Sequence, residues 1–312
     1  MNGRFMNCLD VTLDYFHEKR TDIVDNSVNA LPSVWGISGG YVNYGIVKKQ
    51  GIDFALQLNR ETGDWGYSLG LNVSYVKTEI EKEYEPAYPN EYQYRTGHRV
   101  DQIFGLEAVG FFKDQAEIDN SQTPFHTFTP VKPGDVRYKD QDGNGRIDAN
   151  DEIAIGKGYY PNLNYGILLG LDFKGFSLHA CLQGIGGRDI MVTSLAGPMG
   201  QKAQISDFVM NHWTSENKET ATLPKVTTTT NNNNYRSSTL WLRSADFIRL
   251  RSVQVAYNLS GKALSPLYLS NVKLFLRGMN LLTFDDLKKL DPETLTGYPA
   301  LRSYSIGMCI QF

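Results

Sequence analysis

The sequence predicts an all-β fold, namely an antiparallel transmembrane β-barrel segment with short turns on one rim and long loops on the other. Three observations predict it. Several segments alternate apolar with small or polar residues, as a strand with two unlike faces does. The connections between these segments alternate between short and long, which is typical of bacterial membrane-spanning barrels. Aromatic residues end the clearest apolar face, where rings lie at bilayer interfaces.

The composition agrees with this fold class and argues against others. The chain has 312 residues, of which 41% are hydrophobic, with 18 Tyr, 15 Phe and 29 Gly; this mixture suits an all-β protein. No run of about 20 apolar residues indicates a spanning helix, which a barrel does not need. The net charge of −3 gives no basis for nucleic-acid binding. The odd number and wide spacing of the cysteines argue against a disulfide framework: Cys8, Cys181 and Cys309.

Three strands are expected before the first long loop. The first covers about Arg4–His17, the second residues 52–59, and a hairpin turn at 60–64 leads into the third, Trp65–Tyr75. The N-terminal segment has no apolar core followed by a cleavage site, so it is not expected to be a signal peptide. The third strand alternates most regularly, and its apolar face consists of Trp65, Tyr67, Leu69, Leu71, Val73 and Tyr75.

A long extracellular loop is expected over residues 78–160, with a strand segment at 105–112 inside it. A hairpin follows, with strands at 163–173 and 176–183 joined by Lys174-Gly175. Its first strand has one apolar face and one that is largely small or polar. The hairpin and the loop before it together form the most informative stretch, Pro133–Ile185.

A second long extracellular loop is expected over residues 187–240. Its Thr/Asn run, Thr227–Asn234, is interpreted as solvated, because such tracts rarely bury a core. A strand near Trp241–Leu259 follows, and its alternation changes phase around Arg251-Ser252, which predicts a β-bulge. The last strands are Val272–Leu282 and Tyr304–Phe312, which makes about eight long strands.

The run Asp140–Asp151 has the spacing of an EF-hand calcium loop. Oxygen-bearing side chains stand at positions 1, 3, 5, 9 and 12 and a glycine at position 6, with Asp151 where a glutamate is usual. A structural Ca²⁺ is therefore predicted, and the alternative is a polar turn that binds nothing. The predicted ligands are Asp140, Asp142, Asn144, Asp148 and Asp151, with the backbone carbonyl of Arg146.

Other candidate residues are weighed against ordinary packing. The C-terminal strand could be a barrel-assembly signature read by the insertion machinery, or a half-buried strand that ends on Phe by chance; the residues concerned are Tyr304, Ile306, Met308, Ile310 and Phe312. Loop aromatics could stack on a sugar ring or face a lid protein, although for each one packing within its own loop is the simpler interpretation; they are Tyr92, Tyr94, Phe111, Phe112, Trp213 and Trp241. Arg249 and Arg251 could line a lumen or pair with acidic neighbours.

Five scattered histidines and no catalytic motif predict that the chain is not an enzyme, and no substrate-binding residue is assigned.

Four motifs, spread in order over most of the chain, resemble the C-terminal part of SusC/RagA-type TonB-linked outer-membrane proteins of the Bacteroidetes kind. They are PGDVRYKDQDGNGRID, NYGILLGLDFKGFSLHACLQG, FIRLRSVQVAYNLS and NVKLFLRGMNLLTF. The resemblance implies a 22-stranded barrel in the outer membrane, in contact with its lipids, closed by an N-terminal plug. It further implies import of glycans or peptides driven by TonB, and a SusD-like lipoprotein as an extracellular cap.

The chain departs from that family at its beginning. It contains no TonB-binding segment and no plug, so residues 1–312 are expected to be roughly the last third of the barrel, a fragment or a truncated reading frame. TonB would then act through the missing N-terminal region. Two alternatives stay open: a small stand-alone outer-membrane barrel with a structural or adhesive role, and a secreted, calcium-stabilised β-sandwich that binds glycans.

Overall fold

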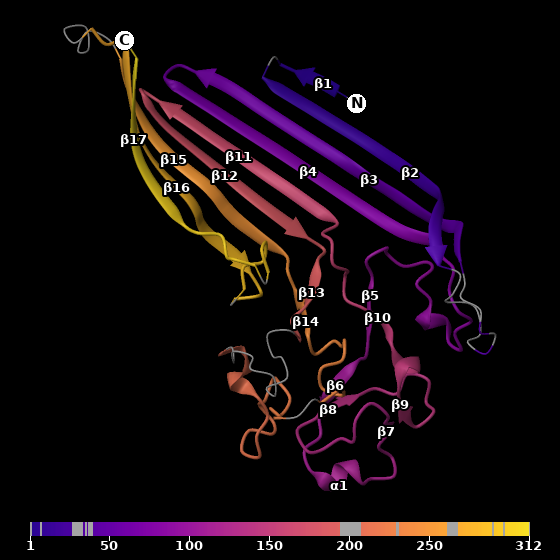
Figure 1. Cartoon of the computed structure of the whole chain (residues 1–312). Coiled ribbons are helices and arrows are strands. Elements are labelled where there is room, and N and C mark those ends of the chain that lie inside the picture. Colours follow the sequence, from indigo (N-terminus) through magenta and orange to yellow (C-terminus); the bar gives the residue numbers. More distant parts are fainter. Residues whose placement is uncertain are drawn as a thin grey trace.

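A computed structural model describes residues 2–6, 8–26, 34, 36, 40–193, 207–228, 231–260, 268–288, 290–295 and 297–311. One antiparallel sheet of nine strands dominates it (Figure 1). In spatial order its strands are β1 (Asn2–Phe5), β2 (Leu9–Asn26), β3 (Tyr41–Thr62), β4 (Trp65–Lys82), β11 (Leu163–Phe173), β12 (Phe176–Gly186), β15 (Phe247–Ser260), β16 (Asn271–Asp285) and β17 (Ser303–Gln311). Every strand pairs with its neighbour in the chain or across a loop excursion, as in a barrel wall that is built up strand by strand.

Short turns lie at one end of the sheet and long connections at the other. Residues 63–64 join β3 to β4, and residues 174–175 join β11 to β12. Residues 83–162 connect β4 to β11 and residues 187–246 connect β12 to β15, both at the opposite end (Figure 1). The described ends of the chain lie at the short-turn end. The predicted fold class, with its short-turn and long-loop rims, is confirmed.

The two faces of the sheet differ in polarity, and the strand register shows it row by row. One row across the wall is wholly apolar, and it reads Val11, Leu56, Leu71, Ile167, Leu182, Leu250 and Leu282. The adjacent row points to the other face and is mostly polar, and it reads Thr12, Ala55, Asn72, Gly166, Gln183, Arg249 and Thr283. Successive residues of a strand point to opposite faces, so one face of the whole wall is apolar.

Glycines opposite aromatic residues fix the register at two places. The ring of Tyr165 covers Gly184 on the neighbouring strand, and the ring of Phe275 covers Gly307. A Cβ atom at either glycine would overlap the ring, so neither position accepts another residue without movement. Such aromatic covering of a strand glycine holds one pairing register against a slip.

The strands differ from the sequence expectation at several ends. The segment expected as the first strand contains two strands, β1 and the start of β2. The chain reverses at Met6, which has a φ of +49°, and Arg4 pairs with Asp10. The segment expected over 105–112 is likewise divided, between β5 (Ile103–Gly105) and β6 (Ala108–Phe111). The strand expected from Trp241 begins at Phe247, since the short strand β14 (Leu242–Ser244) pairs elsewhere. The predicted β-bulge is confirmed, because both registers of β15 shift at Arg251.

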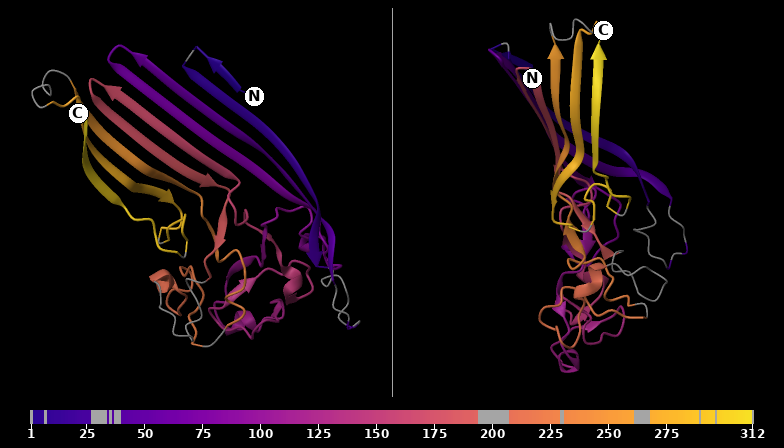
Figure 2. Two further views of the ribbon diagram at one scale, coloured as in Figure 1. Left: turned by 45° about the horizontal axis from the view of Figure 1, so that its top comes forward. Right: turned by 90° about the vertical axis from the view of Figure 1, so that its left-hand side faces the viewer.

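The long connections fold together into one unit, here called the loop body: residues 83–162, 187–193, 207–228 and 231–246. Besides β5, β6 and β14 it contains β7 (Phe125–His126), β8 (Val136–Tyr138), β9 (Arg146–Ile147), β10 (Ile153–Ile155), β13 (Asp189–Met191), the helix α1 (Gln115–Ile118) and the 3-10 helices η3 (Glu91–Gln93), η4 (Ala149–Asp151) and η6 (Asp207–Asn211). Backbone bonds join its distant parts: Leu106 N–H donates to Ser237 O and Thr239 N–H donates to Leu106 O. Both views of Figure 2 place this unit beyond the long-connection end of the sheet.

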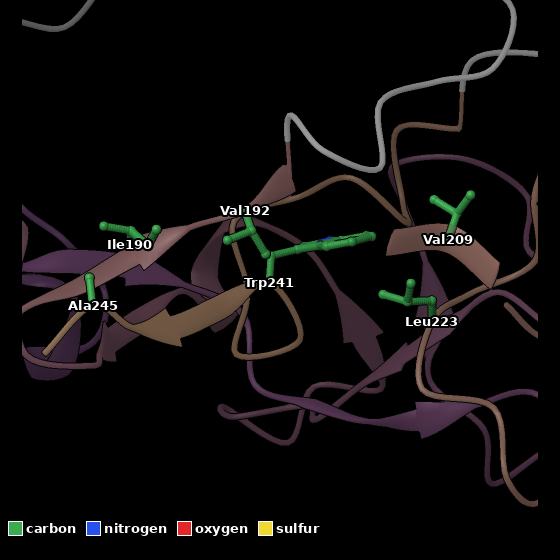
Figure 3. Packing of buried hydrophobic residues seen from close by; sticks show 6 residues of the cluster. All are labelled: Ile190, Val192, Val209, Leu223, Trp241 and Ala245. Carbon is green, nitrogen blue, oxygen red and sulfur yellow. The ribbon is translucent and has the colours of Figure 1, made fainter. Parts of the chain in front are cut away.

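The loop body has two small hydrophobic clusters of its own. The first surrounds Trp241 and contains Ile190, Val192, Val209, Leu223 and Ala245 (Figure 3). The second consists of Leu106, Val136, Tyr138 and Ile147. Leu240 packs against both clusters, so they form one continuous core. The buried hydrophobic residues of the described chain therefore lie mainly in the loop body rather than in the wall.

Candidate functional site: the Asp140–Asp151 loop and its surroundings

The predicted calcium loop brings three carboxylates together. Oxygen atoms of Asp140, Asp142 and Asp151 lie within 4.8 Å of one another. Asp142 is exposed, Asp140 is half-buried and Asp151 is fully buried. Ca²⁺ takes oxygen ligands of this kind, so the donor set fits the predicted ion.

The loop backbone curls around these side chains. Asp140 accepts hydrogen bonds from the backbone N–H groups of Gly143 and Gly145, each at 2.8 Å. Asn144 N–H donates to Asp142 Oδ1 at 3.1 Å. Gly143 and Gly145 have φ values of +71° and +78°, a left-handed conformation that glycine adopts without steric cost. The side chains of positions 1 and 3 are thereby held in place by the backbone itself.

Asp151 closes the loop from the other end. Its two oxygens accept hydrogen bonds from Gln141 N at 2.7 Å and Asp148 N at 2.9 Å. Burial raises the pKa of the Asp151 carboxyl, and the negative charges of Asp142 and Asp140 raise this pKa further. Three carboxylates this close repel one another, and a cation between them would remove that repulsion.

The other predicted ligands have hydrogen-bonding roles within the loop. Asn144 contacts the trio, because its Nδ2 donates to Asp142 Oδ2 at 2.9 Å, while its Oδ1 accepts from Arg146 N at 2.8 Å. Asp148 caps η4 by accepting from Asn150 N at 2.8 Å. Arg146 lies in β9, which pairs in parallel with β7. The structure thus gathers the predicted carboxylates at positions 1, 3 and 12, while position 9 has a capping role.

The loop is attached to the core of the loop body on two sides. Ile147, inside the twelve-residue run, is fully buried in the cluster with Leu106 and Val136. The hydroxyl of Tyr92 donates to Asn150 O at 2.8 Å. An ion bound here would therefore stiffen a junction between several segments of the loop body.

The Thr/Asn run overturns the sequence interpretation, because three of its four asparagines are buried and only Asn232 is exposed. Asn231, Asn233 and Asn234 are 7%, 0% and 1% exposed. Asn233 Nδ2 donates to Val136 O at 2.8 Å, and Asn234 Oδ1 accepts from Val136 N at 2.9 Å. These amides can be buried because each finds hydrogen-bond partners, on Val136, on Asp135 or within the tract itself, which offsets the cost of taking it out of water.

Two ionisable groups belong to this polar core. Asp135 is 2% exposed and accepts bonds from the side-chain amides of Asn231 and Asn234 at 3.0 and 2.8 Å. His126 Nδ1 lies 2.7 Å from Asn233 Oδ1, and its Nε2 is buried without a partner. Since Asn233 Nδ2 already donates to Val136 O, the histidine must donate from Nδ1. Burial lowers the pKa of His126.

The candidate aromatic residues pack inside the loop body. Phe112, Trp213 and Trp241 are at most 6% exposed, so they cannot stack on a ligand. Trp241 Nε1 donates to Asn234 O at 2.8 Å. The Tyr94 hydroxyl accepts from Tyr88 N at 3.1 Å, and Phe111 packs against the second hydrophobic cluster. For the buried rings, the packing interpretation is the correct one.

The two candidate arginines of β15 pair with acidic residues of the segment that follows β16. Arg249 is 2% exposed and contacts Asp291 and Glu293 at 2.9 and 2.8 Å. Arg251 contacts Glu293 at 2.6 Å. This network attaches the connection before β17 to the polar face of the wall, a tertiary contact that neither motif nor spacing could reveal.

The C-terminal strand β17 lies at one edge of the sheet, paired only with β16 among the described strands. Its apolar residues on the outer face are exposed, from 41% to 87%: Tyr304, Ile306, Met308 and Ile310. Phe312, the last residue of the predicted assembly signature, lies outside the described residues. The role of this strand in barrel assembly stays a prediction.

Among the described residues, no helix combines the length and hydrophobicity needed to cross a bilayer. No family model matches the chain. It is 25% identical over 342 aligned residues to TonB-dependent receptor P3 of Formosa agariphila, covering 99% of this chain and 33% of that protein. It is 22% identical to TonB-dependent receptor SusC of Bacteroides thetaiotaomicron over all of this chain and 30% of SusC.

Solved structures show the same fold. The chain matches a structure of the RagAB peptide transporter with a TM-score of 0.71 and 23% identity, over 98% of this chain and 34% of that one. A structure of the RagAB peptide importer in an open-open state gives the same TM-score over 99% of this chain. The chain therefore spans about a third of the length of the proteins it matches.

These similarities confirm the predicted resemblance to the SusC/RagA-type barrel. They also confirm the predicted outer-membrane location. The matched proteins are receptors and transporters, which confirms that the chain is not an enzyme.

Proposed function

We propose that this chain forms the C-terminal part of the barrel of a TonB-dependent outer-membrane importer. The apolar face of the wall carries the proposal. From the row with Tyr75 and Leu163 to the row with Trp65 and Phe173, β11 spans 11 residues. Ten steps of about 3.3 Å at a tilt of about 45° cover roughly 23 Å, close to the apolar band of about 25 Å in outer-membrane barrels.

Aromatic residues at both limits of this band support the same placement. Trp65 stacks on Phe173 with ring centroids 4.1 Å apart at the short-turn end, and Phe176 lies against Tyr257 at 4.4 Å. Tyr15 and Tyr75 are exposed at the other end. Rings at both interfaces are the pattern of membrane barrels, and a secreted sandwich would bury these residues instead.

The importer is proposed to take up glycans or peptides with a SusD-like lipoprotein as its extracellular partner, and to receive energy from TonB through an N-terminal region outside this chain. The similarity to SusC and to the RagAB peptide transporter supports these assignments. The similarity to about a third of the length of much longer receptors favours this function over a small stand-alone barrel.

Uptake in cells tests the proposal. Cells with and without the gene are supplied with defined mixtures of peptides and oligosaccharides, and removal of each compound from the medium is followed. Loss of uptake of one class on deletion, together with recovery of a lipoprotein in affinity purification, is expected. Unchanged uptake of both classes, with the protein present in the outer-membrane fraction, would contradict the importer.

Within the same proposal, the Asp140–Asp151 loop holds a structural Ca²⁺. Asp140, Asp142 and Asp151 would supply carboxylate oxygens, and Arg146 its carbonyl. The ion would neutralise the trio and fix the loop to the core through Ile147. This explains why a buried carboxylate, Asp151, is placed beside two others.

Terbium luminescence tests the calcium site, because Tb³⁺ occupies calcium sites and is excited through a nearby tyrosine. Tyr92 is in contact with the loop through Asn150. We expect tyrosine-sensitised emission that Ca²⁺ competes away. The double change Asp140→Asn and Asp142→Asn should abolish it, whereas Asp64→Asn with Asp119→Asn, both remote from the loop, should not. Equal emission from the two variants would rule out this site.

A further inference from the structure

The outer face of β2, β3 and β4 changes character where the apolar band ends. The last apolar row on this side consists of Tyr15, Ile52 and Tyr75, aligned by the strand register. The next row on the same face is His17, Gln50 and Lys77, and the one after it is Lys19, Lys48 and Glu79. Three of these six positions are lysines, and none is apolar.

The two polar rows lie beyond the end of β11, on the long-connection side of the wall. Strand β11 begins at Leu163, directly opposite Tyr75. Strand β4 continues to Lys82 and strand β2 to Asn26. The three strands therefore project beyond the bilayer band on the long-loop side, at the depth of the lipid headgroups.

Two lysines stand directly opposite each other in this projection. Lys19 pairs with Lys48 in the register, an arrangement that like charges make unfavourable. Glu81 lies between them, with oxygens 2.9 Å from Lys19 Nζ and 3.2 Å from Lys48 Nζ. The ammonium groups of Lys19 and Lys48 thus both contact one carboxylate, that of Glu81.

The ammonium groups remain accessible to further anions. The side chains of Lys19, Lys48 and Lys77 are 43%, 40% and 55% exposed. Lys77 pairs only loosely, at 3.8 Å, with Glu79. Each ammonium has three N–H donors, and one carboxylate contact leaves the others for a second acceptor.

We propose that Lys19, Lys48 and Lys77 bind the phosphate groups of the phosphorylated glycolipid in the outer leaflet of the membrane. The inference rests on the outer-membrane placement of the barrel. The leaflet on the long-loop side presents lipid phosphates at the depth of these rows, and basic side chains beside a membrane interface attract them. The aromatic row below sets the depth, and the lysine rows supply the complementary charge.

Lipid retention by the purified protein tests the proposal. The protein as cells make it is extracted in detergent, stripped of lipid, and mixed with lipid A or with enzymatically dephosphorylated lipid A. Bound lipid is counted by native mass spectrometry. The triple variant with Lys19→Gln, Lys48→Gln and Lys77→Gln is compared with a control triple, Lys113→Gln, Lys139→Gln and Lys225→Gln, whose lysines lie in the loop body.

We expect the wall variant to bind lipid A at least about tenfold more weakly, because each lysine contributes separately near an anionic surface. The control triple should bind as the unmodified protein does. Equal binding by the wall variant overturns the proposal, as does equal binding of dephosphorylated lipid A by the unmodified protein, a result that needs no variant to fold. Uptake assays on the same strains separate this outcome from a failure of the importer.

Discussion

The barrel wall and the loop body obey opposite rules of burial within one chain. In the wall, apolar residues such as Leu169, Leu171 and Ile306 are 40% or more exposed, and the polar residues point to the opposite face. In the loop body, apolar residues such as Trp241 and Ile147 are fully buried, as in a soluble domain. The difference follows from the solvent, because lipid replaces water around the wall and satisfies its apolar face.

The two regions also treat polar groups differently. In the wall, the backbone N–H and C=O groups form their hydrogen bonds through strand pairing, and side chains contribute few further bonds to them. The loop body instead buries side-chain amides and carboxylates, including Asn233 and Asp135, in a connected network. Such a network costs much if one member is lost, since the partners remain buried without bonds.

The largest effect is expected at Arg249, which joins the wall to the connection between β16 and β17. Changing Arg249→Ala leaves Asp291, whose side chain is 8% exposed, without its cation. Loss of one partner of a buried ion pair costs about 3–5 kcal/mol. We expect the urea midpoint of the refolded protein in lipid vesicles to fall accordingly. The exposed Arg302→Ala is the control, and a midpoint unchanged in both would show that the network does not support the wall.

Substitutions at two neighbouring residues test whether the two faces of the wall differ in their surroundings. Leu71 points to the lipid and Asn72 to the interior, since they stand in the apolar and polar rows. Leu71→Arg should destabilise the folded barrel by about 2–4 kcal/mol, the cost of arginine near the bilayer midplane. Asn72→Arg should cost less than about 1 kcal/mol. Folded and unfolded fractions are read from heat-modifiable electrophoretic mobility; equal losses would mean that the faces are assigned wrongly.

The buried asparagines provide a matched test in the loop body. Asn233→Ala removes the bonds to Val136 O and His126, with an expected cost of about 1–3 kcal/mol. Asn232→Ala, at an exposed neighbouring position, should have almost no effect. Resistance of the loop body to limited proteolysis is the measurement. Similar cleavage rates for the two variants would restore the interpretation of the run as a solvated loop.

The smallest effect concerns pH, through His126. Its pKa is lowered from the ordinary value of 6.5, chiefly by burial and against the opposing influence of Asn233 and Asp135. The unfolded state therefore takes up the proton first, and stability is complete above pH 6.5 and declines as the pH falls below it. Hydrogen exchange of the loop body at pH 7.5 and 5.0 measures this. His126→Asn keeps a donor toward Asn233, and the stability of the loop body in this variant should no longer depend on pH. A pH dependence of the same size in the variant would show that another titratable group causes it.

The sequence predicts more of the structure of the wall than of the loop body. The face of each wall strand follows from a period of two residues, which can be read locally, and so the hairpin at Lys174-Gly175 and the β-bulge at Arg251 were predictable. The carboxylates of the calcium-like loop are close in sequence, and Asp140, Asp142 and Asp151 do lie together. Their regular spacing is a local signal of the same kind.

The sequence by itself determined the alternation of the wall, its apolar outer face and the order of its turns and loops, because each depends on neighbours within a few residues. Only the tertiary structure decided that Asn231, Asn233 and Asn234 are buried, that Arg249 meets Asp291, and that Trp241 is covered. Each of these depends on a segment distant in sequence that supplies the partner atoms. A polar tract is solvated or buried according to whether such partners arrive, and no local pattern records that.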